Sequence, residues 1–251
     1  KNLFDGGRRF IGGNRCEKPN EKKIVKETYS LWDYKRELLS AYASFEGERE
    51  TIGLPMVLNF FELLPFWHTL FKNLGFGVKL SPASTKKLYL LGQNSIPSDT
   101  VCYPAKLAHG HIQALVDEGV KTIFYPCLSY NMNEGLGDNH CNCPVVAYYP
   151  RVIAANTAFP ADVRMINNDF GIHRPKDFVK HFHAMLAREF GGISFAETKT
   201  AVNAAYAEYE KYMAQIREKG EEFLKLAKDK GLPMIVLTGR PYHLDKEINH
   251  G

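Results

Sequence analysis

The chain lacks the features that would tie it to a membrane or to nucleic acid. No apolar run approaches the roughly 20 residues that span a bilayer, and the opening KNLFDGGRRF has no apolar core of the kind found in signal peptides. The 32 basic residues are scattered among 28 acidic ones, so the net charge of +4 forms no block of one sign. We therefore expect a cytosolic (cytoplasmic) protein without nucleic-acid or membrane partners.

The chain also lacks the signatures of common nucleotide and hydrolase sites. It contains no serine nucleophile elbow, no phosphate-binding loop of the Walker type and no glycine-rich dinucleotide fingerprint. Five cysteines in 251 residues are too few for a disulfide scaffold. In a reducing compartment, a small set of cysteines is more typical of metal binding or catalysis.

Strand-like runs alternate with helical patterns along most of the chain. Runs typical of buried strands lie at 52–58, 76–80, 121–125, 163–166 and 233–238, and helical spacing occurs near 29–45, 65–74, 84–91, 104–118, 175–190 and 194–230. This alternation predicts an α/β fold with a mainly parallel sheet, Rossmann-like layers of helices on both faces, and one long helix in the C-terminal half. In such sheets, ligands bind beyond the carboxyl ends of the strands.

The same pattern divides the chain into three predicted parts. Residues 1–50 form a connecting arm with one helix, residues 51–158 a Rossmann-like α/β domain that carries four of the five cysteines, and residues 159–251 a second α/β portion with the long helix. The chain begins with Lys and ends soon after a predicted strand and turn. We therefore expect an internal piece of a longer polypeptide, truncated in its second α/β portion.

Three cysteines, Cys102, Cys127 and Cys143, each lie at the end of a predicted element and have a proline within two residues. Cys102 precedes a predicted helix start, where unpaired N–H groups favour the thiolate, the form that binds metal. Cys143 precedes the apolar run 145–148, which we interpret as a strand, so Cys143 would stand at the junction between a loop and that strand. The alternative is that these are ordinary buried thiols, because free cysteine packs as a small hydrophobic side chain.

The spacing of these cysteines limits the kind of metal site. Three thiolates leave a fourth position open, whereas a structural zinc site is usually closed by four ligands in short paired spacings. The spacing also differs from the ferredoxin runs. Cys16, in the predicted arm, is either a surface thiol or an outlying fourth ligand. His109 and His111 lie two residues apart on a predicted helix and so point to different faces, which argues against a shared metal pair.

Several segments, taken together, resemble a known family. They are Ile52-Gly-Leu-Pro-Met-Val-Leu-Asn59, Pro65-Phe-Trp67, Ser98-Asp-Thr-Val-Cys-Tyr-Pro-Ala-Lys106, His109-Gly-His111, Phe124-Tyr-Pro-Cys127, Asn139-His140 with Asn142-Cys-Pro144, Gly239-Arg-Pro-Tyr-His243 with Ile248-Asn-His-Gly251, and Gly13-Asn-Arg-Cys-Glu17. On these residues, nearly the whole chain resembles the acyl-CoA dehydratase activase-related family. Its members are large anaerobic proteins similar to CoA-substrate-specific activases and to components of 2-hydroxyacyl-CoA dehydratases.

The resemblance implies a cofactor and its ligands. Such proteins join an ATPase portion of the actin and hexokinase type to a portion similar to the cluster-binding dehydratase subunits, and this chain looks like the middle of the latter. In those subunits three cysteines hold a four-iron four-sulfur (4Fe-4S) cluster, which carries over to Cys102, Cys127 and Cys143. Cys141 stands where the family implies an aromatic residue, so it is an alternative to Cys143 as ligand.

The functional expectation follows from the resemblance together with the cysteine positions. We expect an iron–sulfur, electron-transfer segment of an ATP-dependent 2-hydroxyacyl-CoA dehydratase activator or reductase-like protein, without a complete active site of its own. Candidate supporting residues are Lys106, His109, Arg240 and His243. The expected partners are the ATPase portion of the same polypeptide and an acyl-CoA dehydratase or acyl-CoA substrate. The alternative is a metal-free docking or acyl-CoA-recognition module of the same system.

Overall fold

The computed structural model describes residues 2–5, 8–11 and 29–249. It forms two units, Lys1–Ser30 and Leu31–Gly251. In the described part of the first unit, strands β1 (Asn2–Asp5) and β2 (Arg8–Ile11) pair antiparallel. Cys16 lies outside the described residues, so its predicted role as an outlying ligand stays a prediction. The domain boundaries predicted at 50 and 158 likewise stay predictions.

The second unit alternates strands and helices. In chain order its elements are α1 (Leu31–Ser40), β3 (Arg49–Leu54), α2 (Phe60–Asn73), β4 (Phe76–Leu80), α3 (Lys86–Gly92), the 3-10 turn η2 (Gln93–Ser95), α4 (Tyr103–Asp117), β5 (Thr122–Phe124), α5 (Pro144–Asn156), β6 (Arg164–Ile166), α6 (Pro175–Glu189), α7 (Phe195–Lys230), the 3-10 turn η3 (Pro241–Leu244) and α8 (Lys246–Asn249). None of the helices in the described part of the chain is long and apolar enough to cross a membrane.

The four strands β3 to β6 form one parallel sheet in the order β4-β3-β5-β6. Ile52 of β3 lies opposite Val78 on one side and Thr122 on the other, and all three are buried. The chain leaves β3 toward β4 and then returns across β3 to β5. The sheet therefore has a topological switch point between the carboxyl ends of β3 and β5.

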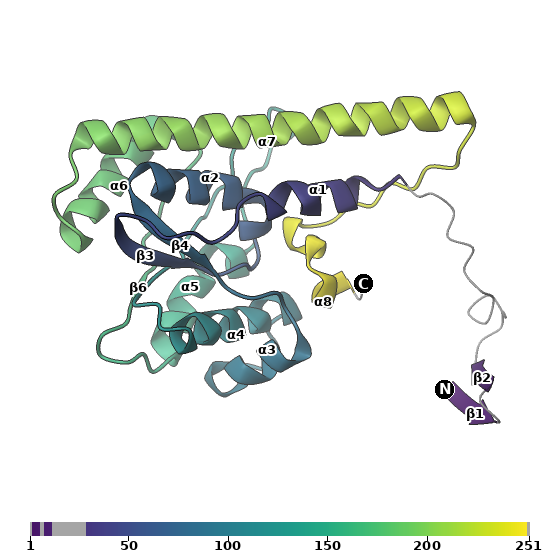
Figure 1. The fold of residues 1–251 in the computed structure, drawn as a ribbon, viewed down its shortest axis with the longest axis horizontal. Coiled ribbons are helices and arrows are strands. Elements are labelled where there is room, and N and C mark those ends of the chain that lie inside the picture. The colour runs from purple at the N-terminus through teal and green to yellow at the C-terminus, as the bar shows by residue number, and fades with distance from the viewer. Residues whose placement is uncertain (1, 6–7, 12–28, 250–251) are drawn as a thin grey trace. The chain divides into compact units, whose positions relative to one another are not determined.

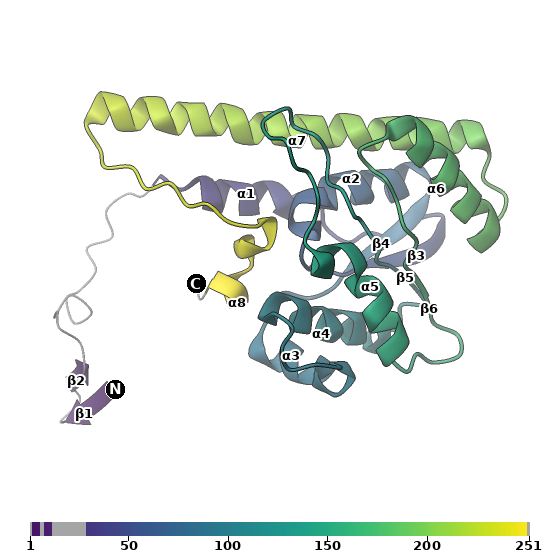
Figure 2. The ribbon, with the colours of Figure 1, turned by 180° about the vertical axis from the view of Figure 1, so that it is seen from behind.

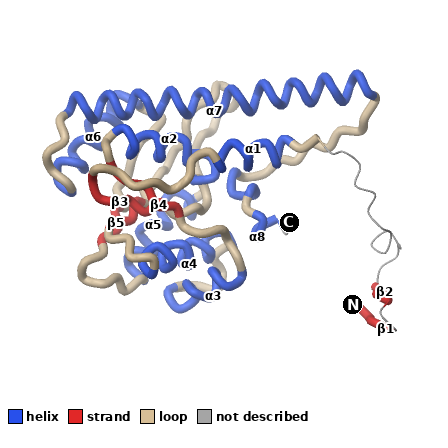
Figure 3. Tube along the Cα trace, in the orientation of Figure 1, coloured by secondary structure: helices blue, strands red, loops and turns tan. Residues whose placement is uncertain are grey.

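Helices cover both faces of this sheet, which confirms the predicted α/β fold. Figure 1 shows α2 and α7 on one face and α3 and α4 on the other, and Figure 2 shows α5 with α4 and α6 with α7. The strands lie between these helical layers (Figure 3). Helices α2 and α4 lie on opposite faces because their crossovers run in opposite directions across the sheet. The crossover with α2 runs from β3 to β4, the one with α4 runs back from β4 to β5, and both are right-handed.

Aromatic side chains fill the layer between the sheet and α2, α6 and α7. The rings of Trp67 and Phe71 lie 4.9 and 5.0 Å from the ring of Phe124 on β5, centroid to centroid. Helix α7 closes this layer with a buried stripe at helical spacing: Ala201, Val202, Ala205, Tyr209, Tyr212 and Ile216. Tyr209 is therefore part of the core.

Helices α3 and α4 cross at two glycines. A Cβ atom added to Gly110 of α4 would lie 2.0 Å from the carbonyl oxygen of Leu88, and one added to Gly92 of α3 would lie 2.2 Å from the Gly110 nitrogen. Only glycine permits this backbone contact, which fixes how α4 lies on α3 and thus where the start of α4 points.

The predicted strand at 233–238 is wrong. These residues follow Gly231, which ends α7 with a φ of 61°, and pair with no strand among the described residues. Ile235 is 85% exposed and Leu237 is 74% exposed. An apolar, β-branched run becomes a strand only beside a free sheet edge. One candidate edge, β4, is occupied at Val78, which exchanges two backbone hydrogen bonds of 2.9 Å with Phe45.

Two further boundaries differ from the prediction. The run 145–148 belongs to helix α5, so Cys143 precedes a helix and not a strand, because Pro144 at the first helical position suits a helix start. Helix α2 begins at Phe60 and contains Pro65, which we expected at its start. Burial of the apolar side chains on both sides of Pro65 outweighs the backbone hydrogen bond that the proline removes.

The glycine contact predicts a strong effect of a small substitution. Gly110→Ala lowers the free energy of unfolding by about 1–3 kcal/mol, because the new methyl group collides with the Leu88 backbone. Gly137→Ala is the matched control, since a Cβ there meets nothing within 4 Å. Urea unfolding followed by circular dichroism measures both. Equal midpoints for the two variants contradict the close crossing.

The exposed apolar run predicts self-association of the purified chain. The double substitution Ile235→Ser with Leu237→Ser reduces light scattering at a given concentration and leaves the urea midpoint unchanged, because both side chains face solvent. Ile123→Ser, at a fully buried position of β5, is the contrasting control and lowers the free energy of unfolding by about 3 kcal/mol or more. A lowered midpoint in the double variant shows instead that the run is packed.

Candidate functional site

Cys127 lies at the carboxyl edge of the sheet, three residues beyond the end of β5 and beside the switch point. Its N–H donates to the carbonyl oxygen of Asn168 at 2.9 Å, and its carbonyl oxygen accepts from the N–H of Phe170 at 3.0 Å. The side chain is fully buried. The backbone after β6 therefore holds Cys127 rigidly, with its thiol away from solvent.

Cys102 and Cys143 occupy equivalent positions at the starts of α4 and α5. Each is the N-cap residue, with φ/ψ of −64°/151° and −62°/150°, and each is followed by a proline in the first helical turn. Neither side chain caps its own helix. Both residues therefore adjoin the positive end of a helix dipole. Cys102 is exposed and Cys143 is partly buried.

The thiol of Cys127 lies in a different electrostatic environment. Burial raises its pKa to about 11, and the carboxylate of Asp169 adds to that rise. The guanidinium of Arg151 opposes it by charge and by hydrogen bonding. Arg151 and Asp169 also form an ion pair with each other. In the metal-free chain, Cys127 is therefore a protonated thiol at neutral pH.

Cys141 differs from Cys143 in exposure and in contacts. It is exposed and forms an isolated β-bridge with Tyr130. A hydrogen bond between the Cys141 thiol and the Tyr130 side chain raises the pKa of Tyr130. The N–H of Cys141 donates to Asn139 Oδ1 at 2.8 Å. Cys141 thus belongs to the loop surface, whereas Cys143 starts a helix of the layer beside α4.

The sequence analysis missed two buried or partly buried tyrosines of this region. Burial raises the pKa of Tyr242, and Cys102 and Cys143 add to the rise. Burial likewise raises the pKa of Tyr125, and Cys127 and Cys102 add to the rise. The signal available in the sequence was position alone, because Tyr125 stands two residues before Cys127.

The C-terminal segment is attached near the start of α4 by Asp245 and Glu247, and not by Arg240 and His243, which the sequence analysis named. Asp245 accepts a hydrogen bond from Ser84, and Glu247 Oε1 accepts one from the Tyr103 hydroxyl at 2.8 Å. These bonds hold η3 and α8 against α3 and the start of α4. Tyr242, carried on η3, is thereby held close to the start of α4.

The predicted supporting residues make mainly local contacts. Lys106 Nζ donates to the carbonyl oxygen of Asp99 at 2.8 Å, which ties down the loop before α4. The N–H of Arg240 donates to His243 Nδ1 at 2.9 Å, so the His243 ring folds back over its own turn. The roles of Lys106, His109, Arg240 and His243 toward a ligand stay predictions.

His109 and His111 are buried hydrogen-bonding groups of α4. His109 bonds Ser95 Oγ at 2.8 Å through Nδ1 and the Tyr149 hydroxyl at 3.0 Å through Nε2. His111 bonds Ser81 Oγ at 2.7 Å and Ser84 Oγ at 2.9 Å. Burial lowers the pKa of His109 to about 4 and that of His111 to about 3. Both rings are therefore neutral at pH 7.

No three side chains of His, Cys, Asp or Glu within the described residues lie close enough to hold a single metal ion. A mononuclear site therefore does not fit. Cys102, Cys127 and Cys143 are sulfur donors at the ends of separate elements, which is the donor type that a group of iron and sulfide uses, and the buried Tyr125 hydroxyl two residues before Cys127 has no partner among the described residues. Such a group stays a prediction. Cys102, Cys127 and Cys143 are the residues that would hold it.

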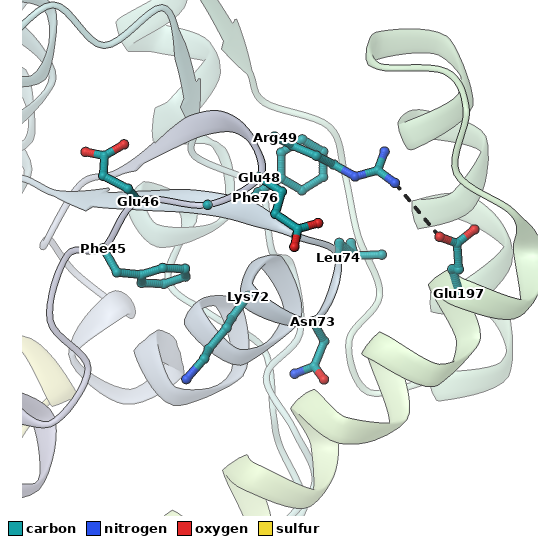
Figure 4. Close-up of a pocket in the computed structure, with 11 residues that line it drawn as sticks. Phe45, Glu46, Glu48, Arg49, Lys72, Asn73, Leu74, Phe76 and Glu197 are labelled. Atoms are coloured by element: carbon teal, nitrogen blue, oxygen red, sulfur yellow. Dashed lines mark ion pairs between the residues drawn. The ribbon is translucent and has the colours of Figure 1, made fainter.

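A shallow pocket of about 470 Å³ lies at the opposite edge of the sheet, beside the amino ends of β3 and β4 (Figure 4). Its lining carries charges of both signs, among them Arg49 and Glu197, whose Nη2 and Oε1 atoms lie 3.9 Å apart. Ligands of parallel sheets bind at the carboxyl edge. We therefore assign no chemistry to this pocket.

Comparison with known proteins identifies a family. A family model described as the CoA enzyme activase uncharacterised domain (DUF2229) matches residues 51–251. No curated protein and no solved structure matches the chain. The matched range contains Cys102, Cys127, Cys141 and Cys143.

The buried histidines predict a loss of stability in acid. The unfolded chain takes up protons near the ordinary histidine pKa of about 6.5, whereas folded His109 and His111 resist protonation down to about 4 and about 3. Stability therefore falls as the pH drops below 6.5, by up to about 1.4 kcal/mol per pH unit for each ring. Urea unfolding between about pH 7 and pH 4.5 measures the slope.

The matched control for this pH dependence is a chain with His109→Gln and His111→Gln, since glutamine retains a donor and an acceptor but does not titrate. Its unfolding free energy depends less steeply on pH over the same window, although its absolute stability is lower. Identical slopes in the two chains contradict the assignment of acid sensitivity to these rings.

Proposed function

This chain belongs to the CoA enzyme activase domain family, whose model covers residues 51–251 of its 251, and we propose that it is the iron–sulfur, electron-transfer segment of an activator or reductase-like protein of this kind. The activase-related role comes from the family. The proposed cofactor is a 4Fe-4S cluster bound by Cys102, Cys127 and Cys143. The proposed system is an ATP-dependent one that serves a 2-hydroxyacyl-CoA dehydratase.

The observation that carries the proposal is the placement of the three cysteines. Cys102 and Cys143 are both N-cap residues with nearly the same backbone angles, and Cys127 follows the central strand β5. All three positions belong to the region where a parallel sheet binds its ligands. Two helix starts beside one sheet edge supply a positive potential that favours a cluster with anionic thiolate ligands.

The residues of the chain would divide the work of binding between them. A bound 4Fe-4S cluster supplies a carrier of single electrons. Cys127, fully buried, would keep one side of the group away from water, whereas Cys102, exposed, would leave another side accessible to an electron donor or a partner. Three protein ligands leave one iron open to solvent, substrate or a fourth residue such as Cys16.

The ATPase portion of the same polypeptide and an acyl-CoA dehydratase or its acyl-CoA substrate are the proposed partners. This segment has no complete active site of its own in the proposal, so it acts within the larger system. We propose the cytoplasm as its compartment, because thiolate ligands persist where cysteines stay reduced. Exposed thiols such as that of Cys102 also oxidise in air, which favours an anaerobic setting.

A metal-free docking or acyl-CoA-recognition module is the second candidate. The observation that favours it is the Cys127 thiol, whose pKa of about 11 keeps it protonated until a metal displaces the proton. Such a module retains the fold and binds its partner through the carboxyl edge of the sheet without iron.

Iron analysis of single cysteine variants separates these functions. After anaerobic reconstitution with iron and sulfide, the unaltered chain binds both in nearly equal amounts. Cys102→Ser, Cys127→Ser and Cys143→Ser each lose most of the iron, because each removes one thiolate ligand. Cys141→Ser retains it, because that thiol belongs to the loop surface.

Circular dichroism of each metal-free variant is the control for folding. Loss of iron with Cys141→Ser and not with Cys143→Ser reassigns the third ligand. Full retention of iron in all four variants, or no uptake by the unaltered chain, overturns the cluster and leaves the metal-free module.

A further inference from the structure

Tyr125 carries a hydroxyl group that is buried and has no hydrogen-bond partner among the described residues. The side chain is 1% exposed and packs against Phe60, with 5.9 Å between the ring centroids. Its N–H donates to the carbonyl oxygen of Ile166 at 2.9 Å. Backbone and ring are thus both held, and the hydroxyl cannot turn to water. A buried polar atom without a partner is rare in a folded chain and requires an explanation.

One of the proposed ligands, Cys127, lies on the same face of the sheet as this hydroxyl. Tyr125 directly follows β5 and stands two residues before Cys127. Both residues pair through their backbone with the segment of β6 and beyond, and residues two apart in such an extended run project from the same face. The unpaired donor therefore lies on the face from which the Cys127 sulfur projects.

The hydroxyl hydrogen of Tyr149, a second buried tyrosine, on α5, already has an acceptor. Ser95 Oγ donates to the carbonyl oxygen of Gly92, so it accepts from His109 Nδ1. Nε2 of the neutral His109 ring then accepts the hydrogen of the Tyr149 hydroxyl at 3.0 Å. Of these two tyrosines, Tyr125 is the one whose hydrogen is not engaged.

We propose that the Tyr125 hydroxyl donates a hydrogen bond to a sulfur anion of the group bound at this edge, either the thiolate of Cys127 or a sulfide of the cluster. The inference rests on the proposed function and names a tuning residue for it. Hydrogen bonds to the sulfur atoms stabilise the more negative, reduced form of a cluster and so raise its reduction potential. Tyr125 would therefore set how readily the cluster accepts an electron.

The first test uses the metal-free chain. Tyr125→Phe removes a hydroxyl that has no partner, so the urea midpoint stays the same or rises. Tyr206→Phe is the matched control, because the Tyr206 hydroxyl donates to the carbonyl oxygen of Ile172 at 2.6 Å, and its removal lowers the midpoint. A midpoint lowered equally by Tyr125→Phe shows that the hydroxyl has a partner within the chain and overturns the inference.

The second test uses the anaerobically reconstituted chain. Tyr125→Phe binds as much iron as the unaltered chain, and a reductive titration followed by visible absorption gives a more negative midpoint potential. Tyr206→Phe leaves the potential unchanged, because its hydroxyl lies on α7 and is bonded elsewhere.

The possible failures are distinguishable. Iron uptake with an unchanged potential in Tyr125→Phe overturns the inference and leaves the proposed function intact. No iron uptake by the unaltered chain overturns the proposed function and the inference with it. Loss of iron in Tyr125→Phe, with a normal metal-free midpoint, makes Tyr125 necessary for binding and overturns its role as a tuning residue.

Discussion

Helices α3 and α4 touch backbone to backbone, and the placement of the candidate site depends on that contact. Gly110 and Gly92 allow it, because side chains at either position would overlap the neighbouring main chain. Because the two helices lie so close, Ser95 hydrogen-bonds His109 and Ser84 hydrogen-bonds His111. Two buried histidine rings therefore attach α4 to residues on either side of α3. These contacts fix the rotation of α4 about its axis. They thereby also fix the position of Cys102 at the N-terminus of this helix.

Periodicity predicted most of the fold because most elements bury their apolar residues against neighbours within the chain. Strands β3, β4, β5 and β6 and the long helix α7 lie within a few residues of their predicted bounds. Where the pattern failed, the missing information was tertiary. The run at 233–238 has strand composition but no sheet edge beside it, and the run at 145–148 was assigned by composition although Pro144 favours a helix start.

The candidate site divides in the same way. Cysteines were found from sequence because they are few and stand at element ends, where prolines mark the boundaries. The tyrosines near them were not found, because Tyr125 and Tyr242 reach the site by chain geometry and not by local pattern. His109 was named as a candidate supporting residue because it belongs to a segment that resembles the family. In the structure it is buried in α4, where it hydrogen-bonds Ser95 and Tyr149.

An exposed loop joins helix α7 to the candidate site. Buried residues of α7 end at Ile216, and its remaining turns lead to the exposed stretch 231–240, which pairs with no described strand. Beyond that stretch, Asp245 and Glu247 anchor η3 and α8 to Ser84 and Tyr103. Tyr242 is therefore positioned by the bonds that anchor η3 and α8, and the exposed stretch only spans the distance between the end of α7 and that anchored turn.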